Sequence, residues 1–176
     1  MTKYKKLESA QISPDLFHSF NRYQKVERCW RKEDGGWVLK DIAFEENWNA
    51  DNIEFLVSCL KNTVATGGTV IGAFQEEILI GFSSLENQPF GEVQEYLQLS
   101  SLHVSCEQRG SGIGKQLFRM AADCAREKGA KKLYISAHPS EETQLFYKSM
   151  KCVETLHYFH NLPGVEPDDC QLEYVF

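Results

Sequence analysis

Apolar and polar positions repeat with two different periods along this chain of 176 residues. A period of two, which places alternate side chains on the same face of a strand, predicts nine extended segments. These segments are 4–7, 26–31, 37–42, 69–74, 78–84, 95–104, 133–137, 152–159 and 171–175. A period of 3.6 predicts helices over 51–64, 113–128 and 141–150, and Ser13-Pro14 starts a shorter one. Strands interleaved with helices indicate a mixed α/β fold.

Turn and capping residues separate these segments and support their boundaries. The sequence Asp-Gly-Gly at 34–36 predicts a hairpin between the second and third strands. Asp51 with Glu54 predicts the start of the helix that follows, and Ser140 predicts the N-cap of the last helix. The length suits one domain, and no repeat or linker interrupts the pattern. We therefore expect a single domain over 1–176.

The strand pattern over 95–104 contains one irregularity. Its leucines occupy odd positions before Ser100, whereas the apolar residues after Ser101 occupy even positions. A β-bulge, which adds one residue to one strand of a pair, shifts the parity in this way. Bulges are frequent beside active sites, so this strand is a candidate position for the functional site.

A turn with three alternating glycines follows this strand. Residues 109–115 read Arg-Gly-Ser-Gly-Ile-Gly-Lys and lead into the next helix. Glycine lets a ligand approach the backbone, and the free N–H groups and dipole of a helix start attract anions. The P-loop pattern is excluded, because Arg109 replaces its first glycine and Gln116 replaces its Ser or Thr. The glycine spacing also departs from the dinucleotide fingerprint G-x-G-x-x-G, so another phosphate site or an empty turn remains.

Composition and charge narrow the possible partners. The net charge of -6 and pI near 5.4 argue against nucleic acid and against an anionic membrane surface. Neither a membrane-length apolar stretch nor a signal-peptide pattern is present, and we expect a cytoplasmic protein. The six cysteines are scattered without a C-x-x-C pair, which predicts reduced thiols, and the histidine spacing predicts no metal site.

Two stretches resemble the GNAT family of acyl-CoA-dependent N-acyltransferases. Arg109-x-x-Gly112-x-Gly114, between a strand and a helix, resembles the pyrophosphate-binding motif of that family. Residues 140–151 resemble the family pattern Asn-x-x-Ala-x-x-x-Tyr-x-x-x-Gly, and Tyr147 falls on its tyrosine. Three positions depart from the pattern, and these are Ser140, Thr143 and Lys151.

The resemblance covers about 69–175 and implies both a fold and a cofactor. The implied fold is a mostly antiparallel central sheet of six to seven strands, flanked by about four helices and splayed at the bulged strand. The implied cofactor is acetyl-CoA, with its pantetheine arm along residues 102–104 and its pyrophosphate on the N–H groups of 109–115. The N–H of Val104 would polarise the thioester carbonyl. The implied cofactor-binding residues are Leu102, His103, Val104, Arg109, Gly110, Ser111, Gly112, Ile113, Gly114, Lys115, Ser140 and Tyr147.

The implied reaction is attack of an amine on the thioester, which requires an acid and a base. Tyr147 is the candidate acid, because its hydroxyl can protonate the departing thiolate. The candidate bases near the central strand are Glu86, Glu92, Glu95 and His103, and Glu95 is taken as the first of them.

Residues 21–48 mix aromatic and cationic side chains and form an excursion on the substrate side. Trp30, Trp37 and Trp48 are candidates for an aromatic wall around the acceptor, while core packing explains them equally well. The expected function is N-acetylation of a primary amine of a small molecule. A catalytically weak acyl-CoA sensor and a protein lysine acetyltransferase are the alternatives. The sequence does not determine the oligomeric state, and a homodimer is one option.

Overall fold

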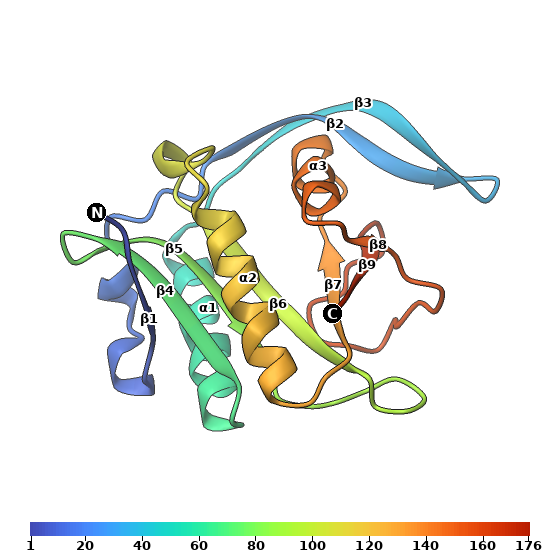
Figure 1. Cartoon of the computed structure of the whole chain (residues 1–176). Coiled ribbons are helices and arrows are strands. Elements are labelled where there is room, and N and C mark those ends of the chain that lie inside the picture. Colours follow the sequence, from blue (N-terminus) through green and yellow to red (C-terminus); the bar gives the residue numbers. More distant parts are fainter.

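A seven-stranded sheet forms the centre of the computed structural model, which describes residues 1–176 (Figure 1). The strand order is β1-β4-β5-β6-β7-β9-β8, and β6 and β7 are its one parallel pair. The strands are β1 (Lys3–Lys6), β4 (Thr69–Gln75), β5 (Ile78–Leu85), β6 (Tyr96–Val104), β7 (Lys132–Ala137), β8 (Val153–Glu154) and β9 (Cys170–Val175). The mixed α/β fold with a mostly antiparallel sheet is confirmed.

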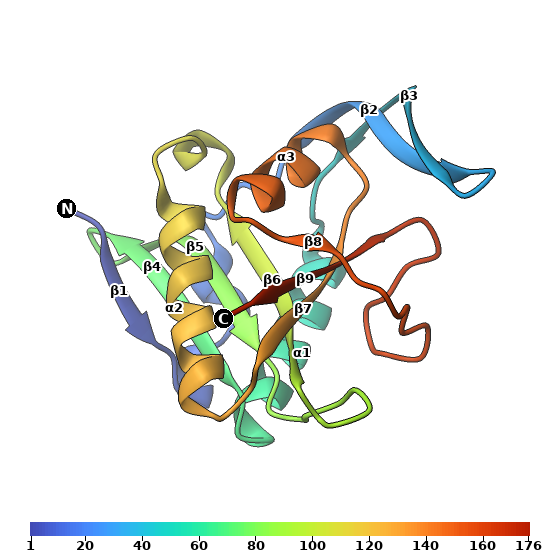
Figure 2. The same ribbon diagram turned by 45° about the vertical axis from the view of Figure 1, so that its right-hand side comes forward.

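Helices cover both faces of this sheet, as Figures 1 and 2 show. On one face, α1 (Ala50–Ala65) packs with the 3-10 turns η1 (Ser9–Gln11) and η2 (Pro14–Phe17). On the other face lie α2 (Ile113–Glu127) and α3 (Glu141–Ser149). Successive side chains of a strand point to opposite faces, so Val70 joins the apolar cluster with α1 and Ile71 joins the cluster with α2.

Three boundaries differ from the sequence prediction. There are three α-helices rather than about four, because Pro14–Phe17 forms only a 3-10 turn. The N-cap of α1 is Asn49, whose side chain and that of Asn52 each accept the other's backbone N–H at 2.9 and 3.0 Å. The strand expected over 152–159 shortens to β8, because Thr155 accepts the His157 N–H at 3.0 Å and begins a turn.

The predicted hairpin, β2 (Gln24–Glu33) and β3 (Gly36–Glu46), forms a separate two-stranded sheet that lies across α3 (Figures 1 and 2). Trp30 N–H donates to the Pro139 carbonyl at 2.8 Å. The Arg28 guanidinium donates to both carboxylate oxygens of Glu141, at 2.9 and 2.7 Å. These contacts attach the hairpin to the first turn of α3.

The predicted bulge is present in β6. Leu85 pairs with Leu99 and Ser84 pairs with Ser101, which leaves Ser100 as the extra residue. Beyond the bulge, β6 and β7 diverge, because they pair only over Tyr96–Gln98 at the start of β6 (Figure 2). One edge of the second half of β6 therefore has no strand partner, and the candidate site lies along this edge.

Candidate active site

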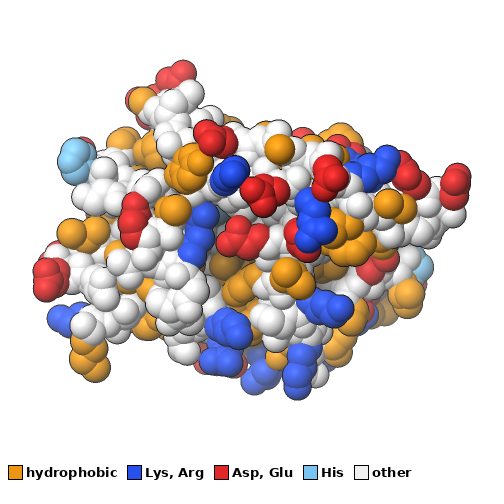
Figure 3. Space-filling view, turned by 90° about the horizontal axis from the view of Figure 1, so that it is seen from above, with side chains coloured by type: hydrophobic (Ala, Val, Ile, Leu, Met, Phe, Trp, Pro, Cys, Tyr) orange, Lys and Arg blue, Asp and Glu red, His pale blue; other side chains and the backbone are white.

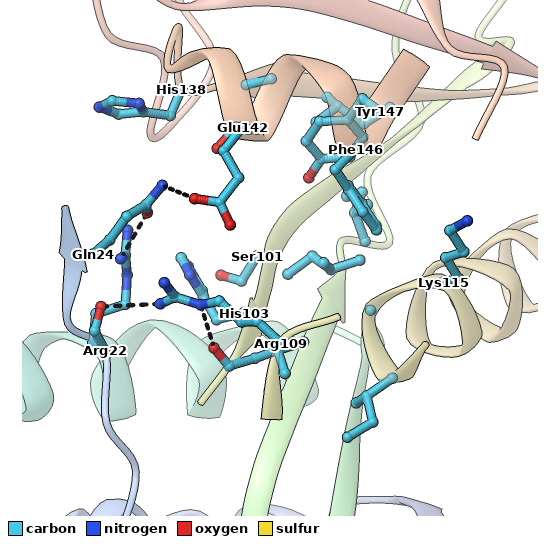
Figure 4. Close-up of a pocket in the computed structure, with 18 of the residues that line it drawn as sticks. Arg22, Gln24, Ser101, His103, Arg109, Lys115, His138, Glu142, Phe146 and Tyr147 are labelled. Atoms are coloured by element: carbon cyan, nitrogen blue, oxygen red, sulfur yellow. Dashed lines mark hydrogen bonds between the residues drawn. The ribbon is translucent and has the colours of Figure 1, made fainter. Parts of the chain in front are cut away.

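The divergence of β6 and β7 opens a cavity of about 530 Å³ (Figure 4). Its walls come from β6, the turn after it, the start of α2, β7, α3, the start of β2 and the end of β3. Figure 3 shows acidic and basic side chains gathered around a hollow on the corresponding face, with hydrophobic side chains inside it. Ten of the predicted cofactor residues line the cavity: Leu102, His103, Val104, Arg109, Gly110, Gly112, Ile113, Gly114, Lys115 and Tyr147.

The free edge of β6 presents backbone N–H and C=O groups to this cavity. Hydrogen-bonding direction alternates along an antiparallel strand. Ser105 N–H donates to the Ile80 carbonyl of β5 at 2.9 Å, so Leu102 and Val104 direct their backbone groups away from β5. An extended ligand can therefore pair with β6 as an additional strand, and the N–H of Val104 is available to a carbonyl oxygen.

The glycine-rich turn forms a cradle of backbone N–H groups at the start of α2. Gly110 and Gly112 have φ of 78° and 88°, a conformation that costs other residues energy. Gly112 is the N-cap of α2 and supplies no capping side chain, so the first N–H groups of this helix remain available. A Cβ on Gly112 would meet no protein atom within 4 Å. This open, electropositive concavity suits a diphosphate.

Arg109 supports the turn through its side chain. Its Nε donates to the Val104 carbonyl at 3.2 Å, and its terminal nitrogen donates to the Arg22 carbonyl at 3.3 Å (Figure 4). These bonds connect the turn to the end of β6 and to the segment before β2. The guanidinium therefore orders the cradle, while the backbone of the turn faces the ligand.

Tyr147 projects from α3 into the cavity beside Phe146 (Figure 4). It packs edge-on against Phe146 and against Phe118 of α2, with ring centroids 5.1 and 6.3 Å away. Burial raises the pKa of Tyr147 above its ordinary value of 10.0. The phenol is therefore protonated at neutral pH and can act as a proton donor.

Ser140 and Lys151 begin and end α3 and serve its structure. Ser140 caps the helix by accepting the Thr143 N–H at 3.3 Å, and its hydroxyl also bonds with that of Thr143 at 2.8 Å. Ser140 and Ser111 were also expected to bind the cofactor. Neither residue lines the cavity with the other ten. Lys151 has φ of 66°, the left-handed conformation for which the family pattern uses glycine.

A polar network that sequence reasoning missed forms the opposite wall (Figure 4). Arg22 donates to Gln24 at 3.0 Å and to the carboxylate of Glu46 at 2.9 Å. His138 Nε2 lies 3.3 Å from the other oxygen of Glu46, and Gln24 donates to Glu142 at 3.4 Å. The hydrogen bond from His138 and the charge of Arg22 lower the pKa of Glu46 below 4.5. This wall therefore carries ionised carboxylate at neutral pH.

Three of these network residues lacked any motif in the sequence. Arg22 precedes β2, Glu46 is the last residue of β3, and His138 follows β7, so their sequence positions are far apart. The excess of cations and aromatics in 21–48 was the one sequence signal at this wall.

His103 is held between aromatic rings at the base of the cavity. Its ring centroid lies 4.9 Å from that of Trp48 and 5.4 Å from that of Phe82. Burial, with added repulsion from Arg22 and Arg109, lowers the pKa of His103 to about 3. The imidazole is neutral at physiological pH and too weakly basic to take a proton from an alkylamine.

The structure does not bring Glu95 or the tryptophans to the cavity lining. Glu95 precedes the opposite end of β6, about 30 Å from Val104 at 3.3 Å per residue, so it is not the base that we expected. Trp37 donates to Glu154 at 3.0 Å, Trp30 packs on the core, and Trp48 supports His103 from behind. The expected aromatic wall is therefore replaced by the polar network.

Comparison with known proteins agrees with the geometry of this site. The model of the acetyltransferase (GNAT) family matches residues 12–151. Among solved structures, a putative streptothricin acetyltransferase from Bacillus anthracis in complex with acetyl coenzyme A has a TM-score of 0.74 at 16% identity, covering 100% of this chain and 99% of that chain. A nourseothricin acetyltransferase has a TM-score of 0.70 at 15% identity, covering 99% and 98%.

A third similar structure is the PaiA N-acetyltransferase from Thermoplasma acidophilum in complex with coenzyme A, with a TM-score of 0.61 at 15% identity and coverage of 100% and 99%. The comparison with curated protein sequences found no match. Fold, site and family model together show that the chain belongs to the GNAT family of acetyltransferases. It is an acetyltransferase that uses acetyl-CoA, and the open cradle and the free edge of β6 are suited to that molecule.

No group of three or more His, Cys, Asp or Glu side chains is arranged to hold a metal ion. No helix has the length and apolar character required to cross a membrane.

Proposed function

We propose that the protein transfers the acetyl group of acetyl-CoA to a primary amine of a small molecule, by direct attack while both substrates are bound. One observation carries this proposal. The same cavity joins the Val104 N–H and the Tyr147 hydroxyl to a wall that contains the carboxylates of Glu46 and Glu142. Carboxylates attract an ammonium group, and a volume of about 530 Å³ is within the usual range for small-molecule sites.

The proposed roles follow from the positions of the groups. The N–H groups of 109–115 hold the diphosphate, and β6 pairs with the pantetheine arm. The Val104 N–H stabilises the thioester oxygen as it gains negative charge. The amine nitrogen forms the new C–N bond, the C–S bond breaks, and Tyr147 donates its proton to the departing sulfur. The similar structures described as streptothricin and nourseothricin acetyltransferases support a small-molecule acceptor.

The test is a panel of acceptors with purified protein and acetyl-CoA. The panel contains monoamines, diamines, aminoglycosides, a streptothricin, lysine-containing peptides and hydroxyl analogues of the amines. Release of CoA is followed continuously, and mass spectrometry identifies the acetylated product. We expect turnover with small amines and none with their hydroxyl analogues.

Two outcomes would contradict the proposal. Tight acetyl-CoA binding by calorimetry without turnover on any acceptor would favour a sensor. Acetylation confined to the peptides would favour a protein lysine acetyltransferase. A Gly112→Val variant, with its cradle obstructed, is the matched control for background release of CoA.

A further inference from the structure

We propose that the proton of the acceptor amine leaves the site through the bulged Ser100 to the carboxylate of Glu86. The inference rests on the proposed function, since it concerns the base that the acetyl transfer needs. Ser100 is the extra residue of the β6 bulge, and it lines the cavity where the two strands diverge. Glu86 follows the end of β5, directly behind that bulge.

Three hydroxyl groups and one carboxylate form a connected chain at this point. The Ser100 hydroxyl donates to Glu86 Oε1, and its oxygen lies 2.7 Å from the hydroxyl oxygen of Ser84. Thr63 of α1 donates to the same Glu86 oxygen at 2.8 Å. Ser84 and Thr63 are buried, at 1% and 3% exposure, whereas Ser100 is open to the cavity. These hydrogen bonds therefore connect the cavity to the Glu86 carboxylate, whose second oxygen takes part in none of them.

The bulge itself creates this arrangement. In a regular strand, the residue after Leu99 would point away from the face that Leu99 covers, and the next would return to it. The added residue lets both Ser100 and Ser101 face the side of the sheet that carries α1, because Ser84 and Thr63 belong to that side. The bulge thus has a second consequence besides separating β6 from β7: it brings the Ser100 hydroxyl to the cavity and to Glu86 at once.

Four other titratable groups of the cavity are less suited to take this proton, and the cavity carboxylate of Asp169 already accepts the Ser136 hydroxyl at 2.7 Å. The Glu46 carboxylate is already bound by Arg22 and lies 3.3 Å from His138 Nε2, and His103 is held neutral with a low pKa. His138 accepts the Ser140 N–H at its Nδ1, at 3.1 Å, so its free lone pair is already used. Glu142 lies on the opposite wall beside Gln24, where it can hold the ammonium group of an acceptor.

The surroundings of Glu86 leave its carboxylate in contact with solvent. Cys59 of α1 is the nearest titratable group on that element. Lys128, at the end of α2, donates to the side chain of Asn87, the residue after Glu86, at 3.0 Å. Neither forms a hydrogen bond with Glu86, whose partners are the hydroxyls of Thr63 and Ser100.

The bound ammonium group first gives one proton to the Ser100 oxygen, while the Ser100 hydroxyl proton passes to the Glu86 carboxylate, which releases it to solvent. The neutral nitrogen then forms the bond to the acetyl carbon. As the C–S bond breaks, Tyr147 protonates the sulfur, and the second proton, which the nitrogen loses as the amide forms, restores the Tyr147 hydroxyl through solvent. Glu86 acts through Ser100 rather than on the substrate, so it is a positioning residue for the serine hydroxyl.

The test compares the pH profiles of kcat/KM for the wild type, Glu86→Gln and Ser100→Ala, with the best amine of the acceptor panel. Glutamine keeps the shape and an acceptor oxygen for Thr63, but it cannot take a proton. Without the relay, the amine must enter already neutral, and an alkylamine has a pKa of about 10.4. We expect a loss of about 100-fold or more at pH 7, which shrinks to less than about threefold at pH 10.

Matched variants make the result specific. Glu54→Gln changes an exposed carboxylate of α1, the helix that carries Thr63, and should leave the profile unchanged. Ser100→Thr keeps a hydroxyl and should restore most of the rate lost in Ser100→Ala. Glu142→Gln should raise KM for the amine and keep the wild-type dependence of kcat on pH. Acetyl-CoA affinity, measured by calorimetry, should be the same in all of these variants.

The outcomes separate the relay from the function. A wild type that acetylates amines, with a Glu86→Gln profile parallel to it at every pH, would overturn the relay and leave the function standing. A wild type without turnover on any acceptor would overturn both. A loss confined to low pH in Glu86→Gln and Ser100→Ala, but absent in Glu54→Gln, would support the relay.

Discussion

The clearest consequence of the site geometry concerns Tyr147→Phe. The substitution removes one hydroxyl and keeps the ring that packs against Phe118 and Phe146. The ring fills the same volume in both proteins, so the helix and the cavity wall keep their shape. Any change in rate therefore reports the loss of the proton donor.

The size of the effect follows from the chemistry of the leaving group. A free thiol has a pKa of about 8.5, so the thiolate departs more readily than an alkoxide would and needs less help from an acid. We therefore take the lower end of the usual range for general acid catalysis, about 100-fold in kcat. This corresponds to about 2.7 kcal/mol of activation free energy. Because burial raises the pKa of Tyr147 above 10.0, the wild-type rate should not fall through ionisation of this group below that pH.

The assay measures CoA release with a thiol reagent at saturating amine. Cys59 is exposed and Cys106 is partly exposed, so the enzyme must be kept at catalytic concentration to limit its own reaction with the reagent. Acetyl-CoA affinity is measured separately and should change less than about twofold, because the hydroxyl acts at the sulfur and not at the diphosphate.

Tyr174→Phe is the matched control. Tyr174 also packs edge-on against Phe118, with ring centroids 5.2 Å apart, and does not line the cavity. An unchanged kcat in Tyr147→Phe would remove this residue from the reaction. Equal losses in the two variants would show that the effect comes from packing of the aromatic cluster.

Three further predictions concern the cradle, the end of α3 and the acceptor wall. Gly112→Ala should lower acetyl-CoA affinity, measured by calorimetry, at least about tenfold. Gly129 has a similar φ, 89°, and open space around it. Gly129→Ala should therefore lower the free energy of unfolding by the same amount as Gly112→Ala, about 1–2 kcal/mol, without loss of acetyl-CoA affinity. Lys151→Gly should stabilise the fold by about 0.5–1 kcal/mol in urea unfolding, because φ is 66° there; Lys151→Ala should give no such gain. Glu46→Gln should lower stability at pH 7 by an amount that shrinks in acid: the folded-state pKa of Glu46 lies below 4.5, so its contribution is present above 4.5 and is lost as pH falls through the folded-state pKa.

Local features of the sequence were sufficient for the cofactor half of the site. The parity change around Ser100, the positive φ required at Gly112 and the helical spacing of Tyr147 depend on residues close together in the chain. Each is a conformational requirement that a short segment imposes on itself. For this reason the bulge, the turn and the position of α3 agree with the expectation.

The acceptor half depended on contacts that no local pattern encodes. Glu95 belongs to the correct strand, but its distance along that strand removes it from the site. Trp37 is on the correct hairpin, but it binds Glu154 and faces away from the cavity. A residue's proximity in sequence says little about which end of a strand, or which side of a hairpin, faces a given cavity.

The sequence by itself determined the elements of this protein, its bulged central strand and its glycine-rich turn, because these follow from periodicity and from the backbone freedom of glycine. Only the tertiary structure decided which side chains complete the site. Arg22, Glu46 and His138 meet because the hairpin crosses α3, and Ser100 reaches Glu86 because the bulge is set against the end of β5. These side-chain contacts depend on how segments that are distant in sequence pack together, and the pattern of residues along the sequence does not specify that packing.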